Sequence, residues 1–341
     1  MKTNVGVAGL GIYIPESRMR ATEISKATKG VWSEDAVINK LGIVQKPIPD
    51  ENDGTQEMGA KAAIEALKDA KINASEIDVI LCMGEEWKEY PLTTSALYIQ
   101  DKIGAVNAWG IDVQNRCCST VSALKMARDM LVADDEINVV MIVGGYRNGD
   151  LVDYTDTSAS MLFNLSAGGG AIILKKNLAK NLLLGSHIKA DGSFARDAGV
   201  EIGGINKPFT ADNIAKGYRS LRLMNAEHMK NGLNAISMPN WYECIDSALA
   251  KSGLTRADID YVALLHFKKS MHDIMLKDLG LSEDQSIYLS DYGHMGQIDQ
   301  ILSLKLALDA GKVVDGSNVL LVAAGIGYVW SASVIKWGGV A

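Results

Sequence analysis

Residues 66–78 read ALKDAKINASEID, and residues 248–260 read ALAKSGLTRADID, 182 positions further along the chain. Each segment has the composition of a helix end followed by a turn. Each leads into a short run rich in leucine and β-branched residues, DVILCMG after the first and DYVALLHF after the second. Such runs are typical of strands buried on both faces. The pair therefore predicts a helix-to-strand unit that occurs twice.

Two further pairs of segments repeat this relationship at a spacing of 180 positions. SALKMARD at 122–129 matches LSLKLALD at 302–309, and NVVMIVGG at 138–145 matches NVLLVAAG at 318–325. Three matches in the same order at nearly one spacing indicate a duplicated α/β unit. Strands alternate with helices throughout, which favours mostly parallel sheets with helices on their faces.

The duplication sets the expected domain organisation. We place the boundary near residue 178, which gives an N-terminal half of residues 1–178 and a C-terminal half of residues 179–341 that pack about a pseudo-twofold axis. Residues 186–240, which include Pro208 and Pro239, are expected to form a variable insertion ahead of the second helix.

Composition excludes several classes of function. The chain has 341 residues, of which 48% are hydrophobic and 22% charged, as expected for a soluble protein with one large core or two domains. Its net charge of -7 would repel a nucleic acid backbone. No run approaches the roughly 18 apolar residues of a membrane helix, and the N-terminus lacks the pattern of a signal peptide. Neither nucleic acid nor membrane is an expected partner.

Cysteine spacing points to a reducing compartment. Cys82, Cys117, Cys118 and Cys244 show no Cys-x-x-Cys spacing, so we expect neither disulfides nor a metal site. The expected location is the cytoplasm, and no permanently bound cofactor is expected.

Chemically distinctive residues occupy equivalent places in the two copies. Cys117 and His294 precede equivalent helices, and Glu86 and His266 follow equivalent strands. Because the carboxyl ends of parallel strands share one edge of a sheet, these four residues should converge on one pocket.

The residue types suit thioester chemistry. A cysteine at a helix N-terminus has thiolate character, two histidines can accept its proton or stabilise an enolate, and a carboxylate can move protons. The alternative reading of Cys117 is a small buried hydrophobe, and of the histidines, structural residues. For Cys118 we expect packing, and Glu85 remains an alternative to Glu86.

Several ordered motifs extend this reading over nearly the full chain. NRCCSTVSALK, LLHF, YGHMG and GIGYVWSASVIKW occur in the order of the thiolase superfamily. The chain resembles hydroxymethylglutaryl-CoA synthases of the archaeal type most, and β-ketoacyl-acyl-carrier-protein synthase III closely. The resemblance implies the thiolase fold, a duplicated αβαβα layered unit. It also implies that Cys117 is the acylated nucleophile, His266 a catalytic histidine, Glu86 the general acid/base, and the backbone N–H groups of Cys117 and Ile326 the oxyanion hole.

The sequence departs from the pattern of these families at two places, so their substrates cannot be assigned to this chain from the resemblance. Gly293-His294 stands where those two families have Gly-Asn, whereas thiolases and elongating synthases have a histidine there. Lys268 and Lys269 stand within the usual His-Gln-x-Asn stretch that begins at His266. These lysines could bind coenzyme A phosphates or could belong to a solvated surface.

The expected function is that of an acyltransferase. It takes an acyl group from an acyl-CoA or acyl-carrier protein onto Cys117 and then condenses it with a second thioester, by Claisen or aldol chemistry, with the histidine at position 294 favouring Claisen. The alternatives are a strict hydroxymethylglutaryl-CoA synthase, a thioester hydrolase and a non-catalytic thiolase-fold partner. The resemblance further implies a homodimer and possible thiolase-type partner subunits.

Overall fold

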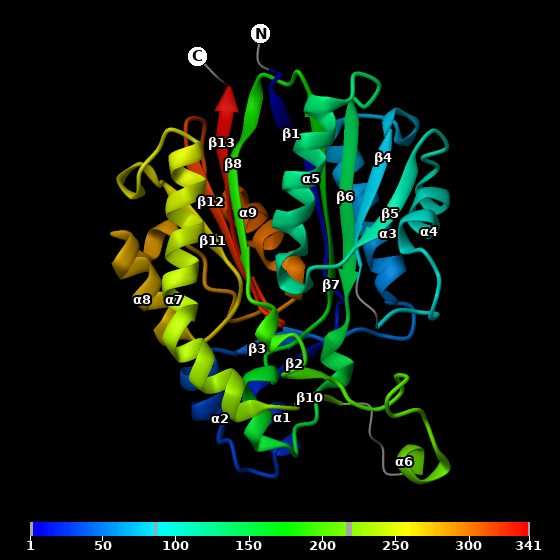
Figure 1. Cartoon of the computed structure of the whole chain (residues 1–341), viewed down its shortest axis with the longest axis vertical. Coiled ribbons are helices and arrows are strands. Elements are labelled where there is room, and N and C mark those ends of the chain that lie inside the picture. The colour runs from blue at the N-terminus through cyan, green and yellow to red at the C-terminus, as the bar shows by residue number, and fades with distance from the viewer. Residues whose placement is uncertain (1–2, 85–86, 216–219, 340–341) are drawn as a thin grey trace.

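The architecture is a single large sheet folded around two central helices. The computed structural model describes residues 3–84, 87–215 and 220–339. Nine strands form one sheet in the order β11-β12-β13-β8-β1-β7-β6-β4-β5 (Figure 1). In chain order the strands of the N-terminal half are β1 (Val5–Tyr13), β4 (Val79–Met83), β5 (Trp109–Val113), β6 (Val139–Tyr146) and β7 (Gly168–Lys176). Those of the C-terminal half are β8 (Lys180–Ala190), β11 (Tyr261–Leu264), β12 (Asn318–Gly325) and β13 (Val329–Gly339).

Strand order repeats between the halves. The order β4-β6-β7-β1 in the first half corresponds to β11-β12-β13-β8 in the second, and β1 meets β8 at the centre. The three matched sequence pairs fall in corresponding elements, so the duplication seen in the sequence coincides with the repeat in strand order. The boundary expected near residue 178 falls in the turn between β7 and β8.

The sheet is mixed in direction. β4 pairs in parallel with β5 and β6, and β11 pairs in parallel with β12, in line with the expected parallel arrangement of the outer strands. The five remaining pairings, which involve β1, β7, β8 and β13, are antiparallel. The reason is that each half finishes by folding its last strand back beside the one before it, β7 beside β6 and β13 beside β12, rather than through a crossover helix.

The helices and the two halves of the sheet form five layers: outer helices, one half of the sheet, central helices, the other half of the sheet, and outer helices (Figure 1). Two central helices, α5 (Ser119–Ala133) and α9 (Asp299–Asp309), lie between the halves. Their apolar side chains pack with strands of both halves in the largest hydrophobic core. The outer helices are α3 (Thr55–Ala70) and α4 (Ser95–Ile103) over the N-terminal half, and α7 (Ala226–Lys251) and α8 (Lys269–Leu279) over the C-terminal half. This layered arrangement is the one that the family resemblance implies.

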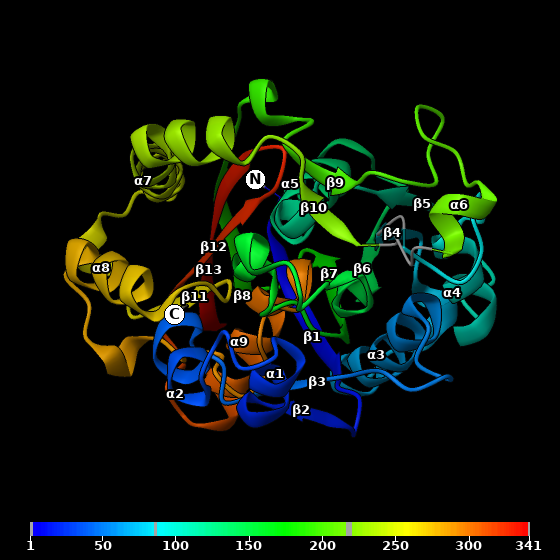
Figure 2. The ribbon, with the colours of Figure 1, turned by 90° about the horizontal axis from the view of Figure 1, so that it is seen from below.

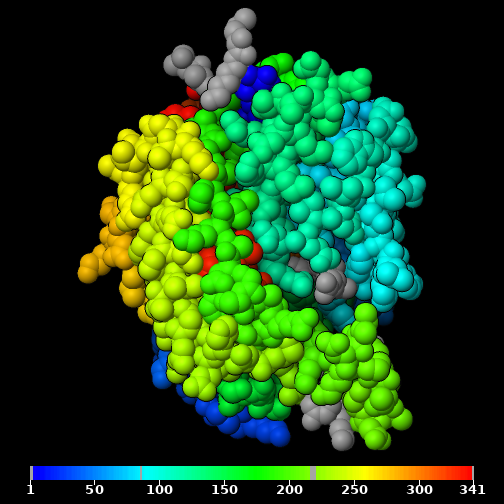
Figure 3. All heavy atoms as spheres, in the orientation of Figure 1, coloured from blue at the N-terminus to red at the C-terminus, as the bar shows by residue number. Residues whose placement is uncertain are grey.

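Short elements gather at the end of the molecule opposite the chain termini (Figures 1 and 2). They are β2 (Arg18–Arg20), α1 (Ala21–Ala27), α2 (Glu34–Ala36), β3 (Gln45–Pro47), β9 (Ala198–Val200), α6 (Ala211–Ala215) and β10 (Leu221–Leu223). Part of this region, around α6, stands out from the body of the molecule in Figure 3. Together these elements surround the carboxyl ends of the parallel strands, where the candidate site lies.

The expected insertion is shorter than its predicted span of 186–240. β8 continues to Ala190, and α7 already begins at Ala226, with Pro239 inside the helix. Packing explains the difference: Trp241, Cys244 and Ile245 on the later turns of α7 are buried in the outer core of the C-terminal half, which holds the helix together beyond the proline.

Candidate active site

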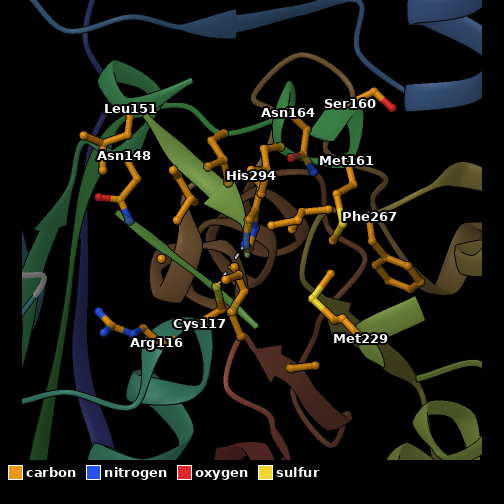
Figure 4. Close-up of a pocket in the computed structure, with 18 of the residues that line it drawn as sticks. Arg116, Cys117, Asn148, Leu151, Ser160, Met161, Asn164, Met229, Phe267 and His294 are labelled. Atoms are coloured by element: carbon orange, nitrogen blue, oxygen red, sulfur yellow. Dashed lines mark hydrogen bonds between the residues drawn. The ribbon is translucent and has the colours of Figure 1, made fainter. Parts of the chain in front are cut away.

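Cys117 lies in a tight turn between β5 and α5. The turn is a 3₁₀ segment, Arg116–Cys118, and Arg116 adopts the left-handed conformation with φ of 50°. A non-glycine residue with this backbone is strained, and such strain clusters at functional sites. The turn exposes the Cys117 thiol to a pocket, as Figure 4 shows, while leaving the residue 8% exposed. Cys117 therefore has the geometry of a presented nucleophile.

The neighbouring Cys118 points into the protein. Its thiol is fully buried and lies 3.4 Å from the carbonyl oxygen of Val329. Burial raises its pKa well above the ordinary value of a thiol. The expectation that Cys118 is a packing residue is thus consistent with its surroundings.

The end of β12 closes against the Cys117 turn. A Cβ atom placed on Gly325 would lie 3.1 Å from the backbone nitrogen of Cys117 and 3.0 Å from Cβ of Arg116, so only a glycine fits without displacing the turn. This contact brings Ile326, the residue after Gly325, to the same pocket as Cys117. The two backbone groups expected to form the oxyanion hole therefore belong to adjoining segments.

His294 contacts the candidate nucleophile directly. Its Nε2 lies 3.1 Å from Sγ of Cys117 (Figure 4). Its Nδ1 lies 2.6 Å from Oδ2 of Asp299. Because the carboxylate can only accept, Nδ1–H donates to Asp299 and Nε2 is left to take the thiol proton. The three side chains form a relay of nucleophile, base and orienting carboxylate.

Asp299 is fully buried at the first turn of α9. Its two oxygens also accept hydrogen bonds from the backbone N–H groups of His266, at 2.7 Å, and Met295, at 2.8 Å. Burial opposes a charge on His294, but the neighbouring Cys117 and Asp299 raise the pKa of that imidazole well above its usual value. The arrangement favours the imidazolium form of His294.

His266 lies in the same pocket but has different partners. Its Nε2 donates to the carbonyl oxygen of Gly42 at 3.1 Å, and its Nδ1 lies 3.0 Å from the side-chain nitrogen of Asn164. Burial lowers the pKa of His266 to about 4, so the ring is neutral near pH 7. The structure brings His266 to the predicted pocket, yet both ring nitrogens are engaged away from the Cys117 thiol.

The structure places the remaining predicted residues, Lys268, Lys269 and Glu86, differently. Lys268 lines the pocket mouth and is exposed. Lys269 forms a salt bridge with Asp273 and is absent from the pocket lining, so of these two lysines Lys268 is the one that lines the pocket. Glu86, the expected general acid/base, and its alternative Glu85 lie outside the described residues.

Three residues of this site were not anticipated from the sequence: Asp299 and Asn164, which contact the histidines, and Lys46, which holds the segment that contains Asn164. Asp299 reads as an ordinary acidic residue at a helix start, where it would favour the helix dipole. Asn164 lies in a turn and Lys46 in the short strand β3. The one available signal was a carboxylate five residues after His294.

The pocket is large enough for a thioester and its carrier arm. Its volume is about 1340 Å³, and it reaches from Cys117 to the short elements at the open end of the molecule. Apolar side chains dominate the lining, among them Met161, Met229 and Phe267, which Figure 4 places on one side of the histidine–cysteine pair. An apolar wall suits an acyl chain or pantetheine-like arm.

Two kinds of feature are absent from the described ranges of the chain. No helix there combines the length and apolar character needed to cross a bilayer. No cluster of three or more histidine, cysteine, aspartate or glutamate side chains there could hold a metal ion.

Comparison with known proteins shows the family to which the chain belongs. The model for 3-oxoacyl-[acyl-carrier-protein] synthase III matches residues 111–192, and the model for the C-terminal part of the same enzyme matches residues 249–337, which together span half of the chain. The protein belongs to the thiolase-superfamily condensing enzymes of the synthase III type. The segments matched contain Cys117, His266 and His294.

Relatives extend over the whole length. The chain is 26% identical over 340 residues to β-ketoacyl-[acyl-carrier-protein] synthase III of Clostridioides difficile, and the alignment covers 99% of each protein. The structure of synthase III from Thermus thermophilus superposes with a TM-score of 0.82 at 24% identity, covering 98% of this chain and 100% of that one. The priming β-ketosynthase of the R1128 polyketide pathway gives a TM-score of 0.81 at 22% identity, covering 98% and 97%. These structures support the thiolase fold.

Proposed function

We propose that this protein is an acyl-thioester condensing enzyme in which Cys117 carries the acyl group and His294 moves the protons. The observation that carries the proposal is the relay from the Cys117 thiol through His294 to the buried Asp299, which opens into a large apolar pocket. A scaffold protein has no use for such a relay, so the relay argues against a non-catalytic partner role. The names of the relatives, which are β-ketoacyl synthases III, agree with this chemistry.

In the proposed first step, Cys117 is acylated. Nε2 of His294 takes the thiol proton, the sulfur bonds to the acyl carbon, and the carbon–sulfur bond of the incoming thioester breaks. The leaving thiolate takes the proton back from the imidazolium. The developing oxyanion would be held by the backbone N–H groups of Cys117 and Ile326, whose segments adjoin at Gly325.

In the second step, a new carbon–carbon bond forms. Neutral His294 accepts a proton from the α-carbon of a second thioester, the carbanion attacks the acyl carbon on Cys117, and the cysteine thiolate leaves. The proton on His294 then returns to that thiolate. This is a Claisen condensation, and it is favoured here because the residue beside the thiol is a base rather than the amide of hydroxymethylglutaryl-CoA synthases.

In this scheme the two histidines have different roles. We assign thiol deprotonation to His294, because His266 directs Nε2 to the Gly42 carbonyl and Nδ1 to Asn164. His266 would shape the pocket wall and, through its backbone N–H, hold Asp299. An aldol outcome, as in a strict hydroxymethylglutaryl-CoA synthase, would require an acid for the ketone oxygen, a part that Glu86 would play.

The acyl donor would be a thioester of coenzyme A or of an acyl-carrier protein. Both present a pantetheine arm ending in phosphate, and Lys268 at the pocket mouth is the cation we propose for that phosphate. No resident cofactor is needed for either step.

One observation favours a second candidate function. A cysteine, a histidine and an aspartate connected in this order also suit hydrolysis of the acyl-enzyme, since His294 could equally activate a water. A thioester hydrolase is therefore the alternative.

Isotope-labelled acetyl-CoA distinguishes the two functions. We expect the protein to take up one label per chain and to keep it in buffer for a time much longer than one catalytic turnover. The label should leave, as a longer thioester, only when malonyl-CoA, malonyl-carrier protein or a second acyl-CoA is added. Release of labelled acetate without an acceptor would identify a hydrolase. Absence of label with every donor tested would contradict both functions.

A further inference from the structure

Lys46 is a buried lysine in an unusual setting. It lies in β3, its side chain is almost completely buried, and no carboxylate of the described residues lies within salt-bridge distance of its amine. A buried cation without a counter-ion is costly, and burial lowers the pKa of Lys46 to about 7. The residue therefore needs a reason other than charge pairing.

Its amine holds two backbone carbonyls. Nζ donates to the carbonyl oxygen of Phe163 at 2.7 Å and to that of Leu165 at 2.5 Å, and it also lies 5.2 Å from the ring centre of Tyr154. The two carbonyls flank Asn164. Lys46 is thus hydrogen-bonded to two carbonyl groups of the 163–166 segment.

The other side of the same segment holds the backbone of His294. The backbone N–H of His294 donates to the carbonyl oxygen of Asn164 at 2.7 Å, and that of Ser166 donates to the carbonyl oxygen of His294 at 3.0 Å. Residues 163 and 164 form a turn, and Leu165 makes an isolated β-bridge with His294. The carbonyl oxygens of residues 163 and 165 accept from Lys46, whereas that of residue 164 accepts from the backbone of His294, so Lys46 and His294 bind different carbonyl groups of one short segment.

Gly293 makes this contact close. Its φ is +62°, and a Cβ atom there would lie 2.5 Å from the carbonyl oxygen of Asn164 and 3.2 Å from Cβ of Lys46. The turn before His294 is therefore packed directly against the 163–166 segment and the side chain of Lys46.

The segment also reaches the second histidine. The side-chain nitrogen of Asn164 lies 3.0 Å from Nδ1 of His266, and Figure 4 shows Asn164 beside His294 in the pocket. One short segment consequently fixes the backbone of His294 and the ring of His266.

We propose that Lys46 is a positioning residue for the active site: its amine holds the 163–166 segment, and this segment sets the place of His294 relative to Cys117 and the orientation of His266. The inference rests on the proposed function for its biological meaning. The geometry that it concerns can be measured without any acyl substrate.

The test compares Lys46→Met, which keeps the length and removes the donors, with Lys46→Gln, which keeps a shorter donor. Lys176→Met is the matched control, because Lys176 also donates to a backbone carbonyl, that of Asp134, far from the site. The first readout is the rate of Cys117 alkylation by iodoacetamide, with Cys117→Ala as the blank. The second is NMR of ¹³C-labelled imidazoles, in which His187 and His228 serve as internal references.

We expect Lys46→Met to slow alkylation by about tenfold or more, since small displacements of a reacting pair are costly, with Gln intermediate and Lys176→Met unchanged. The signals of His266 and His294 should move in both Lys46 variants while those of His187 and His228 stay. A folded Lys46→Met protein with alkylation within about twofold of wild type and unmoved imidazole signals would overturn the proposal.

If Lys46→Met does not fold, Lys46→Gln decides, and wild-type alkylation and signals in that variant would likewise overturn the proposal. Failure of the proposed function would show itself separately, as wild-type enzyme that is alkylated normally but accepts no acyl group.

Discussion

At the scale of single residues, the pairing of His294 with Asp299 sets the chemistry of the site. The carboxylate fixes which nitrogen of His294 bears the proton and, with Cys117, raises the pKa of the ring against the effect of burial. Asp299→Asn should therefore lower the pKa of His294, because it removes the negative charge and leaves an amide. Imidazole NMR titration measures this value, and an unchanged pKa in the variant would show that Asp299 does not act on His294.

The same pair makes a pH-dependent contribution to stability. The folded-state pKa of His294 lies above its ordinary value near 6.5, so the stabilisation is complete below about pH 6.5 and is lost as the pH rises through the raised pKa. The difference in unfolding free energy between wild type and Asp299→Asn should accordingly be larger at pH 6 than at a pH above the raised pKa.

A second residue-scale prediction concerns the base itself. His294→Ala removes the proton acceptor at 3.1 Å from the thiol and should slow acylation of Cys117 by about 10²–10⁴-fold, the usual contribution of general base catalysis. His294→Asn keeps a hydrogen-bond donor and should lose less, with a change in the condensation product. Single-turnover acylation and product analysis across the three proteins measure this. An alanine variant as fast as wild type would reduce His294 to a structural role.

The sequence anticipated part of this site. Cys117, His266 and His294 were predicted because the duplication and the motif order both placed them at strand and helix ends, and all three line one pocket. Asp299 was missed because an acidic residue at the start of a helix is common, although it follows His294 by only five residues. Lys46 was missed because it lies 117 residues before Phe163, whose carbonyl oxygen it binds, and no local pattern links two positions so far apart in the sequence.

At the scale of elements, the approach of β12 to the Cys117 turn is the feature most sensitive to substitution. Gly325→Ala places a methyl group 3.0–3.1 Å from atoms of that turn, which must then shift by a few tenths of an ångström. We expect acylation to fall by about tenfold or more while stability falls by only about 1–3 kcal/mol.

Gly192→Ala is the matched control for this prediction, because a Cβ atom there meets nothing within 4 Å and its φ is not left-handed. Rapid-quench acylation and chemical denaturation give the two quantities. If Gly325→Ala and Gly192→Ala acylate equally fast, the turn is more tolerant than the close contact implies.

Elements were predictable where they repeat. The strands β4, β6, β11 and β12 and the helices α5 and α9 lie where the three matched segments indicated. The antiparallel return strands β7 and β13 were not distinguished from parallel ones, since a buried run has the same composition in either direction. The first turns of α7 were missed because Pro239 marked a break that tertiary packing overrides.

At the scale of the whole molecule, the two edges of the sheet differ. β11 is buried along its full length, whereas β5 is an edge strand with Trp109 and Ile111 exposed on one face, at 47% and 39%. An open edge with apolar side chains favours pairing with another chain. We propose that two copies join through β5, as the homodimer expected from the family resemblance requires.

Sedimentation equilibrium measures the assembly. Wild type should have about twice the monomer mass of 36.6 kDa at micromolar concentration, and Ile111→Arg should shift it toward monomer. Val31→Arg, at an exposed apolar position away from β5, should leave the mass unchanged. A wild-type monomer would contradict the dimer, and an Ile111→Arg dimer would place the interface elsewhere.

The central claim is that Cys117 becomes acylated, and intact-mass spectrometry after exposure to a panel of acyl-CoAs tests it most directly. The account predicts a mass increase of one acyl group in wild type and in Cys118→Ala, because Cys118 is buried away from the pocket, and none in Cys117→Ala. An acyl adduct that survives in Cys117→Ala would contradict the account.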